Sequence, residues 1–186
     1  MIDLKKTVFA ILAICLVLTA VSCGSAAAPE GMVALSGENL TYNVYVPKTW
    51  TASLSGGAVS AYAEDMSNVS VQTSPVPKNT EGDKELYADI NDLWENGYKV
   101  SLGYTFSQIE YAETAETTLG GEKALKAEYK VRVFDISAKA EKEYSIMQII
   151  TRKESDYYIL TYTAETANYK LHTEEVNSII STFSFK

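Results

Sequence analysis

The chain has 186 residues, of which 46% are hydrophobic and 22% charged, and its formal net charge at pH 7 is −8. This length suits one domain with its own hydrophobic core. An excess of acidic residues repels nucleic acid and anionic lipid headgroups, which argues against both as directly bound partners. Two cysteines and one histidine are too few for the common structural zinc sites, and no cofactor is expected.

The first 22 residues are typical of an export signal. Lys5 and Lys6 precede an apolar run over residues 8–21. That run is about fourteen residues long, whereas a helix that spans a bilayer needs roughly twenty. We therefore interpret residues 1–22 as a signal peptide that is not part of the fold.

The apolar run ends in residues 20–23 (AVSC), which resemble the lipobox of bacterial lipoproteins, although leucine is commoner there than Ala20. In that family the cysteine thiol receives a diacylglyceryl group, and the signal peptidase cuts just before it. The resemblance implies cleavage between Ser22 and Cys23, lipidation of Cys23, and anchoring at the extracytoplasmic face of a bacterial membrane. The alternative is an ordinary secretory signal with an incidental cysteine.

Residues 23–38 are predicted to be a lipid-anchored flexible tether, because residues 24–38 are small and polar and show no periodicity. A tether of this length spans about 20 Å. The folded domain is then expected to cover residues 39–186 and to be monomeric.

The first part of this domain is predicted to consist of β-strands. Residues 40–46 are rich in β-branched and aromatic side chains. Residues 51–54 and 58–63 flank a Gly-Gly pair, which predicts a hairpin, and residues 68–73 alternate like a further strand.

Residues 80–96 are predicted to form a helix, with Thr80 or Asp83 as its cap and Asn96-Gly97 as its end. One face is apolar through Leu86, Ile90, Leu93 and Trp94. The opposite face is acidic through Glu85, Asp89 and Asp92. Carboxylates suit calcium or magnesium, but a straight helix does not close around an ion, so a solvated face is the preferred interpretation.

Strand patterns return from residue 106 and include residues 124–134, 143–151 and 157–164. Short connections force these strands to pair antiparallel. The last of them is apolar on both faces, so the sheet must be covered on both. A terminal helix from about residue 168 supplies the second cover. The predicted fold class is α+β, a three-layer α/β/α sandwich in which an antiparallel sheet is covered by a helix on each face.

The order of these motifs resembles that of PsbP-like domains. Residues 42–50 (YNVYVPKTW) are similar to that family's opening strand and Pro-x-x-Trp turn, and residues 121–124 (GEKA) to its central hairpin. Residues 157–186 are similar to its final strand, helix and Ser-Phe-aromatic ending. The resemblance implies the α/β/α sandwich of PsbP and of DcrB-like bacterial lipoproteins. It implies no activity, because proteins of this fold do unrelated things.

No catalytic set is evident in the sequence. His172 lies beside Glu174 and Glu175 on the predicted terminal helix and is interpreted as a surface residue, without the G-x-S-x-G motif of a serine nucleophile. Trp50 and Trp94 are interpreted as core side chains. The preferred function is a non-catalytic, lipid-anchored binding or accessory module of the cell envelope, with the membrane and an envelope protein as partners. The alternatives are a carboxylate-based hydrolase and a structural or stress-related envelope lipoprotein.

Residues 98–104 form the candidate partner-binding loop, between the predicted helix end and the strand from residue 106. They carry four apolar or aromatic side chains: Tyr98, Val100, Leu102 and Tyr104. Exposed apolar side chains that cluster on a loop often mark a partner site. The alternative is that these side chains pack beneath the helix or form an edge strand.

Overall fold

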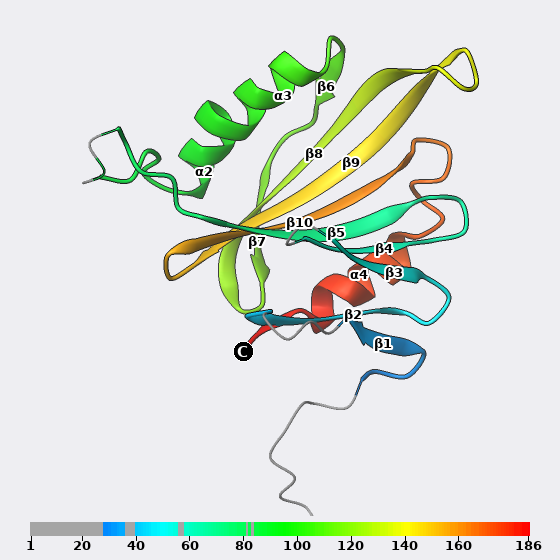
Figure 1. The fold of residues 1–186 in the computed structure, drawn as a ribbon, viewed down its shortest axis with the longest axis horizontal. Coiled ribbons are helices and arrows are strands. Elements are labelled where there is room, and N and C mark those ends of the chain that lie inside the picture. The colour runs from blue at the N-terminus through cyan, green and yellow to red at the C-terminus, as the bar shows by residue number, and fades with distance from the viewer. Residues whose placement is uncertain (1–27, 36–39, 56–57, 81, 83) are drawn as a thin grey trace, which may run out of the picture.

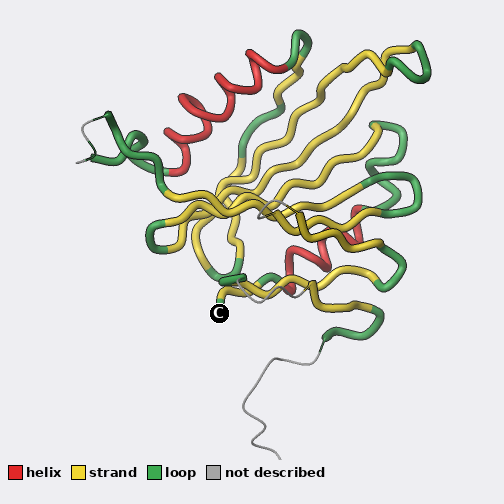
Figure 2. Tube along the Cα trace, viewed as in Figure 1, coloured by secondary structure: helices red, strands yellow, loops and turns green. Residues whose placement is uncertain are grey.

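The computed structural model describes residues 28–35, 40–55, 58–80, 82 and 84–186. Within these ranges the chain is a mixed α/β domain built mostly from antiparallel strands (Figures 1 and 2). The predicted signal peptide, with Ser22 and Cys23, lies outside the described residues.

The larger of two sheets has the strand order β3-β4-β5-β10-β9-β8-β6, and β7 also pairs with β8. The hairpin predicted over residues 51–63 and the antiparallel pairing predicted for the second half of the chain are confirmed. The strands are β3 (Thr51–Ser55), β4 (Ala58–Tyr62), β5 (Asn68–Pro75), β6 (Ile109–Tyr111), β7 (Ala115–Leu119), β8 (Glu122–Asp135), β9 (Ala140–Lys153) and β10 (Asp156–Glu165).

The smaller sheet has the order β1-β2-β11. Its strands are β1 (Met32–Leu35), β2 (Tyr42–Pro47) and β11 (Ser184–Phe185). The prediction of a flexible tether is therefore wrong for residues 32–35. Pairing with β2 and the burial of Met32 and Leu35 order this segment. The predicted tether also includes residues 24–27 and 36–38, which lie outside the described residues.

One helical segment covers part of the large sheet. It runs without a break through α2 (Ile90–Asp92), the π-helical turn η1 (Leu93–Tyr98) and α3 (Lys99–Thr105). The side chain of Asp89 caps its start by accepting hydrogen bonds from the N–H groups of Asn91 and Asp92. A helix therefore exists in this region, but the predicted bounds of residues 80 and 96 are wrong.

Two local interactions explain this displacement. Lys78 and Glu85 form an isolated antiparallel bridge, which keeps the chain before the cap non-helical. Gly97 lies inside the helix instead of ending it, and a Cβ atom there would come within 2.8 Å of the Tyr87 ring. Leu86 consequently lies outside the helix and is 52% exposed.

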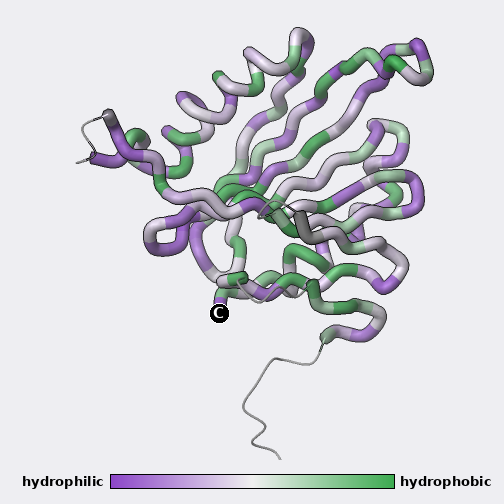
Figure 3. Tube along the Cα trace, in the orientation of Figure 1, coloured by the Kyte–Doolittle hydropathy of each residue, from purple (hydrophilic) through white to green (hydrophobic). Residues whose placement is uncertain are grey.

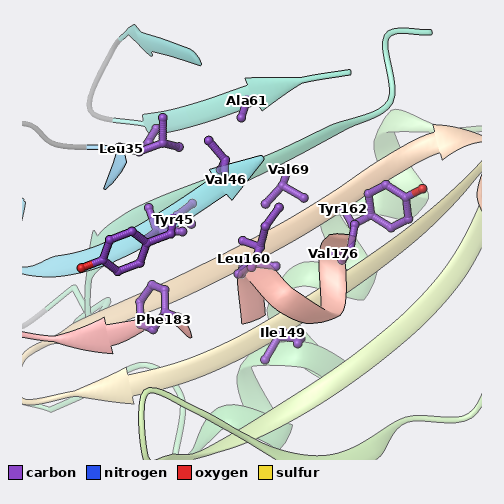
Figure 4. Close-up of a cluster of buried hydrophobic side chains, with 14 of the residues drawn as sticks. Leu35, Tyr45, Val46, Ala61, Val69, Ile149, Leu160, Tyr162, Val176 and Phe183 are labelled. Atoms are coloured by element: carbon purple, nitrogen blue, oxygen red, sulfur yellow. The ribbon is translucent and has the colours of Figure 1, made fainter. Parts of the chain in front are cut away.

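The second helix, α4 (Thr173–Thr182), packs on the other face of the large sheet together with the smaller sheet. Val176 and Ile179 point into the core, and Figure 4 shows Val176 beside Leu160. Leu171, which falls within the terminal helix predicted from about residue 168, precedes the observed helix and is 70% exposed.

A hydrophobic cluster lies on each face of the large sheet. The first joins the sheet to α4 and to β1 and β2 (Figure 4). The second lies beneath the helical segment of residues 90–105. Trp50 belongs to the first cluster and Trp94 to the second, at 5% and 2% exposure, so their assignment to the core is confirmed.

The expected sandwich with one helix on each face is not confirmed in that form, because α4 shares its face with the smaller sheet. In Figure 3 hydrophobic green gathers around α4 and β2, whereas much of the hydrophilic purple lies at peripheral turns.

Candidate functional site

A groove with a volume of about 400 Å³ lies beside the start of α4. Its floor is formed by β6, β8 and β9, and its wall by the connection between β10 and α4. We call it the β8–β9 groove. The lining residues that matter for its chemistry are Glu110, Glu128, Lys130, Tyr169 and Lys170.

The charged floor of the groove follows from the pleat of β8. Tyr129 is buried beneath the helical segment, so its neighbours Glu128 and Lys130 point to the face that α4 occupies. Both find opposite charges, since Lys126 Nζ lies 3.1 Å from Glu128 Oε1 and Lys130 Nζ lies 3.7 Å from Glu143 Oε1. The floor is therefore polar, and each of these charges is paired with an opposite charge from the same sheet.

Hydrogen bonds fix the wall to the sheet. The N–H of Thr166 donates to the carbonyl of Glu143 at 2.9 Å, and the hydroxyls of Thr166 and Ser145 hydrogen-bond at 3.0 Å. The hydroxyl of Tyr162 donates to the carbonyl of Tyr169 at 2.8 Å, and the centroids of these two rings are 4.8 Å apart. The ring of Tyr169 is thus held in place before any ligand binds.

Tyr169 connects the wall to the floor. Its hydroxyl donates to Glu128 Oε1 at 3.3 Å. Burial, followed by the negative charge of Glu128, raises the pKa of Tyr169, so the hydroxyl stays protonated at neutral pH. In the part of the chain that the structure describes, Lys170 and Glu110 form no side-chain ion pair, which leaves their charges available to a ligand at the rim.

A second hollow of about 290 Å³ continues the groove along β8 and shares Glu110 and Lys130 with it. Arg132 Nε lies 3.1 Å from Glu143 Oε2. This hydrogen bond is the main cause of the lowered pKa of Glu143, which is therefore ionised at neutral pH. The two hollows together form an elongated surface that suits an extended ligand better than a compact one.

His172 lies in a second polar cluster, outside the groove. Its Nδ1 is 2.7 Å from Glu175 Oε2, its Nε2 is 3.3 Å from Asp65 Oδ1, and Trp50 Nε1 donates to the same Glu175 oxygen at 3.3 Å. Burial acts to lower the pKa of His172, but Glu175 and Asp65 raise it overall. Because carboxylates engage both ring nitrogens, the imidazole is not placed to activate a serine. The interpretation of His172 as a plain surface residue is corrected, since its side chain is 20% exposed.

The four residues of the predicted partner-binding loop lie on the helical segment, so the prediction of a loop is wrong. The helix continues through Gly97, and α3 contains Val100, Leu102 and Tyr104. Tyr98 and Leu102 pack against the second hydrophobic cluster, whereas Val100 is 46% and Tyr104 89% exposed. Only one side of this segment is therefore accessible to a partner, and its role in binding stays a prediction.

The predicted acidic helix face does not form either. Glu85 precedes the helix and pairs with both terminal nitrogens of Arg152 at 2.6 Å. Asp89 is the helix cap, and Asp92 accepts a hydrogen bond from the side chain of Asn96 at 2.6 Å. Among the described residues, no group of three or more His, Cys, Asp and Glu side chains is arranged to hold a metal ion.

The sequence reasoning missed the groove residues. The signal was present in the alternation of charged and apolar side chains along residues 125–132, where charges recur at every second position. The wall residues Tyr169 and Lys170 carry no comparable signal, because they come from a turn that the sequence assigned to the terminal helix.

No helix in the described ranges combines the length and the apolar character that crossing a membrane requires.

No protein-family model and no curated protein matches the chain. A solved structure does: the solution structure of cyanobacterial PsbP (CyanoP) from Synechocystis sp. PCC 6803 has a TM-score of 0.58 and 16% sequence identity. The match covers 89% of this chain and 99% of CyanoP. The chain has a PsbP-like fold.

Two further solved structures are less similar to the chain. A crystal structure from Bacteroides thetaiotaomicron VPI-5482 matches at TM-score 0.50 and 12% identity over 78% of this chain and 45% of that one, so the chain spans less than half of that protein. LpqN of Mycobacterium tuberculosis, described as involved in cell envelope biogenesis, matches at TM-score 0.49 and 8% identity over 83% of this chain and 90% of LpqN. At 16% identity, the similarity to CyanoP shows the fold alone.

Proposed function

We propose that the chain is a non-catalytic accessory module of the bacterial cell envelope, anchored by a lipid on Cys23, that binds an extended ligand in the β8–β9 groove. The ligand is a segment of an envelope protein. We describe the domain as a variant of the α/β/α sandwich, in which the smaller sheet joins α4 in one layer. The observation that carries the proposal is the preformed wall at Tyr169 beside the charges of Lys170 and Glu110.

The charge states favour binding over hydrolysis. A carboxylate-based hydrolase needs one carboxyl group whose pKa is raised, so that it can donate a proton. Beside the groove, the pKa of Glu143 is lowered, first by its hydrogen bond with Arg132.

Position-specific photo-crosslinking in living cells tests the proposal. A photoreactive residue replaces Ala167 in the groove wall or, as the matched control, Ala138 in the turn between β8 and β9; both positions are exposed. We expect a discrete protein adduct from position 167 that is absent from position 138. The additional substitution Lys170→Glu should remove the adduct without changing the amount of protein. Equal adducts at both positions, or none at position 167, would contradict a binding role for the groove.

A further inference from the structure

Four strongly exposed apolar side chains lie in or beside three turns of the domain. At the tip of the β8–β9 hairpin, Phe134 is 63% and Ile136 is 83% exposed. Met66, between β4 and β5, is 69% exposed, and Leu171, before α4, is 70% exposed. Together with Tyr104 of α3, these are the most exposed of the large apolar side chains that the structure describes. Apolar side chains that gather on one side of a protein often mark a contact with a partner or a membrane.

Strand pairing places these three turns at the same end of the large sheet. Tyr62 of β4 lies opposite Asn68 of β5, and Asn68 lies opposite Thr163 of β10. Thr163 in turn lies opposite Ile146 of β9, and Ile146 lies opposite Tyr129 of β8. Beyond this row β4, β8 and β10 end, whereas β5 and β9 begin. The three turns therefore lie on one side of the row, along the right of Figure 1, and we call this side of the domain the turn end.

The described chain also begins at the turn end. Met32, the first residue of β1, lies opposite Pro47, the last residue of β2. A short turn then leads from β2 to Thr51, the first residue of β3, which lies opposite Tyr62. The start of β1 is therefore at the same end of the molecule as the three apolar turns (Figure 1).

This position relates the turn end to the expected lipid anchor. Ala28, the first described residue, follows Cys23 by five positions, and five residues span at most about 18 Å. A lipid on Cys23 would therefore keep the turn end within reach of the bilayer. The β9–β10 turn lies at the opposite end of the sheet, separated from the β8–β9 turn by the 14 residues of β9, or about 45 Å.

The β8–β9 hairpin projects beyond the neighbouring strand and has a fixed tip. β8 and β9 pair as far as Asp135 and Ala140, whereas β10 ends opposite Tyr144. Within the tip, Asp135 Oδ1 accepts hydrogen bonds from the N–H groups of Ser137 and Ala138 at 2.8 and 3.0 Å. The apolar side chains of the tip are thus held outward before anything binds them.

The turn between β4 and β5 exposes Met66 although its backbone favours another residue. Met66 has φ +69°, a left-handed conformation that suits glycine or asparagine and is unfavourable for a long side chain. The turn is closed by the N–H of Met66, which donates to the carbonyl of Ala63 at 3.1 Å. Neither the backbone conformation nor burial accounts for a methionine at this position, so its apolar side chain points to a contact outside the fold.

We propose that the turn end rests on the bilayer, with these four apolar side chains in its interfacial region. The inference rests on the lipid anchor of the proposed function, because that anchor brings the turn end to the membrane. Moving apolar side chains out of water stabilises the contact. Three separate turns can meet a fluid lipid surface without the complementary shape that a protein interface requires.

Exposed charged side chains at the turn end carry both signs. They are Lys48, Lys139, Lys170, Glu30, Glu64 and Glu141. Because they supply no net attraction to anionic headgroups, the contact depends on the apolar side chains and is expected with a zwitterionic lipid such as phosphatidylcholine. This agrees with the acidic composition of the chain, which argues against direct binding of anionic lipid.

Fluorescence quenching on the mature, acylated chain in phosphatidylcholine vesicles tests the inference. A fluorophore is attached to Ser137→Cys in the β8–β9 turn or, as the matched control, to Ser155→Cys in the β9–β10 turn; both serines are exposed. Acylation of Cys23 and removal of Cys15 with the signal peptide leave the introduced cysteine as the only free thiol. We expect a nitroxide-labelled lipid to quench the label at position 137 much more strongly than the label at position 155, and aqueous iodide to show the reverse order.

Two double variants show whether the exposed apolar side chains make the contact. Phe134→Ser/Ile136→Ser should remove most of the lipid quenching at position 137, because burial of two such side chains shifts the contact equilibrium by about tenfold or more. The control Leu86→Ser/Val100→Ser removes two exposed apolar side chains from outside the turn end and should leave the quenching unchanged. An unaltered unfolding midpoint verifies that each variant is folded.

Co-flotation with the vesicles reports the lipid anchor separately from the contact. A wild type that floats but is quenched equally at both positions would overturn the inference and leave the anchor intact. A wild type that does not float would overturn the anchor, and the inference with it. Protection of position 137 from both quenchers would mean that a protein, such as a second copy of the chain, covers the tip, which also overturns the inference.

Discussion

His172, in the turn before α4, lies with its Nε2 atom 3.3 Å from Oδ1 of Asp65 in the turn between β4 and β5. The same imidazole contacts Glu175 on its other nitrogen, and its ring meets Trp50 edge-on at 5.5 Å between centroids. A single histidine thus connects the start of α4 to two turns of the sheet. Its interaction with the two carboxylates is stronger when the imidazole is protonated.

This arrangement predicts a pH-dependent stability. Because the pKa of His172 is raised in the folded state, its contribution is fully present below the unfolded value of about 6.5 and is lost as the pH rises through the folded value. The free energy of unfolding should therefore be higher at pH 6 than at pH 8.5, as measured by urea titration. In His172→Gln this difference should shrink markedly. An undiminished difference in the variant would assign the pH dependence to other groups.

Much of the fold was accessible from the sequence because local patterns and tertiary packing agree there. Alternation predicted β5, a Gly-Gly pair predicted the hairpin of β3 and β4, and strand-like composition predicted β8, β9 and β10. The terminal helix was also predicted, although α4 begins at Thr173 and not near residue 168.

The rest depends on contacts between distant residues. A glycine normally signals a helix end, but Gly97 lies within the helix against the ring of Tyr87, and no local pattern reveals that. The four residues of β1 (MVAL) lie in a stretch of otherwise small and polar residues, and only their pairing with β2 shows that they form a strand. The groove wall likewise depends on a contact between distant elements. Tyr169, in the connection between β10 and α4, packs against Tyr162 of β10.

Buried helix residues should determine stability, whereas their exposed neighbours should not. Leu93 and Ile179 are 4% and 0% exposed, so replacing either by alanine should cost about 2–5 kcal/mol. The matched controls are Leu86→Ala and Leu171→Ala, at 52% and 70% exposure, with changes within about 0.5 kcal/mol. Chemical denaturation of all four variants measures the free energy of unfolding. A large loss of stability in Leu86→Ala or Leu171→Ala would show that the helix bounds are misplaced.

Alanine substitution at two adjacent glycines, Gly120 and Gly121, distinguishes the cost of backbone strain from the cost of a steric clash. Gly120 and Gly121 both have positive φ, +60° and +85°, so alanine at either should cost about 1–2 kcal/mol. A Cβ atom on Gly120 would also approach the Phe185 ring at 2.9 Å, whereas one on Gly121 meets nothing within 4 Å. Gly120→Ala should therefore be less stable than Gly121→Ala by about 1–3 kcal/mol. Equal midpoints would mean that Phe185 moves aside freely.

Tyr98 and Tyr104 should respond differently to replacement by serine. Tyr98 packs against the second cluster, and its pKa is raised by burial and by nearby Tyr87, so Tyr98→Ser should lower the unfolding midpoint. Tyr104 is 89% exposed, so Tyr104→Ser should leave the midpoint unchanged. If the exposed side of α3 binds a partner, Tyr104→Ser together with Val100→Ser should reduce cross-linked capture. Unchanged capture would show that Val100 and Tyr104 do not form a partner-binding surface.

The lipid anchor is tested most directly at Cys23. Residues 20–23 (AVSC) resemble a lipobox, and Cys15, the other cysteine, follows bulky Ile14 in the apolar run, where the peptidase requires a small residue. Cys23→Ala should therefore leave an unprocessed precursor, or a protein that moves from the detergent phase to the aqueous phase on partition. Cys15→Ala is the matched control and should be processed and partitioned like the wild type. Because two acyl chains hold a protein stably where one does not, the wild type should remain in the detergent phase through repeated washing. A Cys23→Ala protein that matures normally and still enters that phase would show that the chain is held at the membrane by something other than this cysteine.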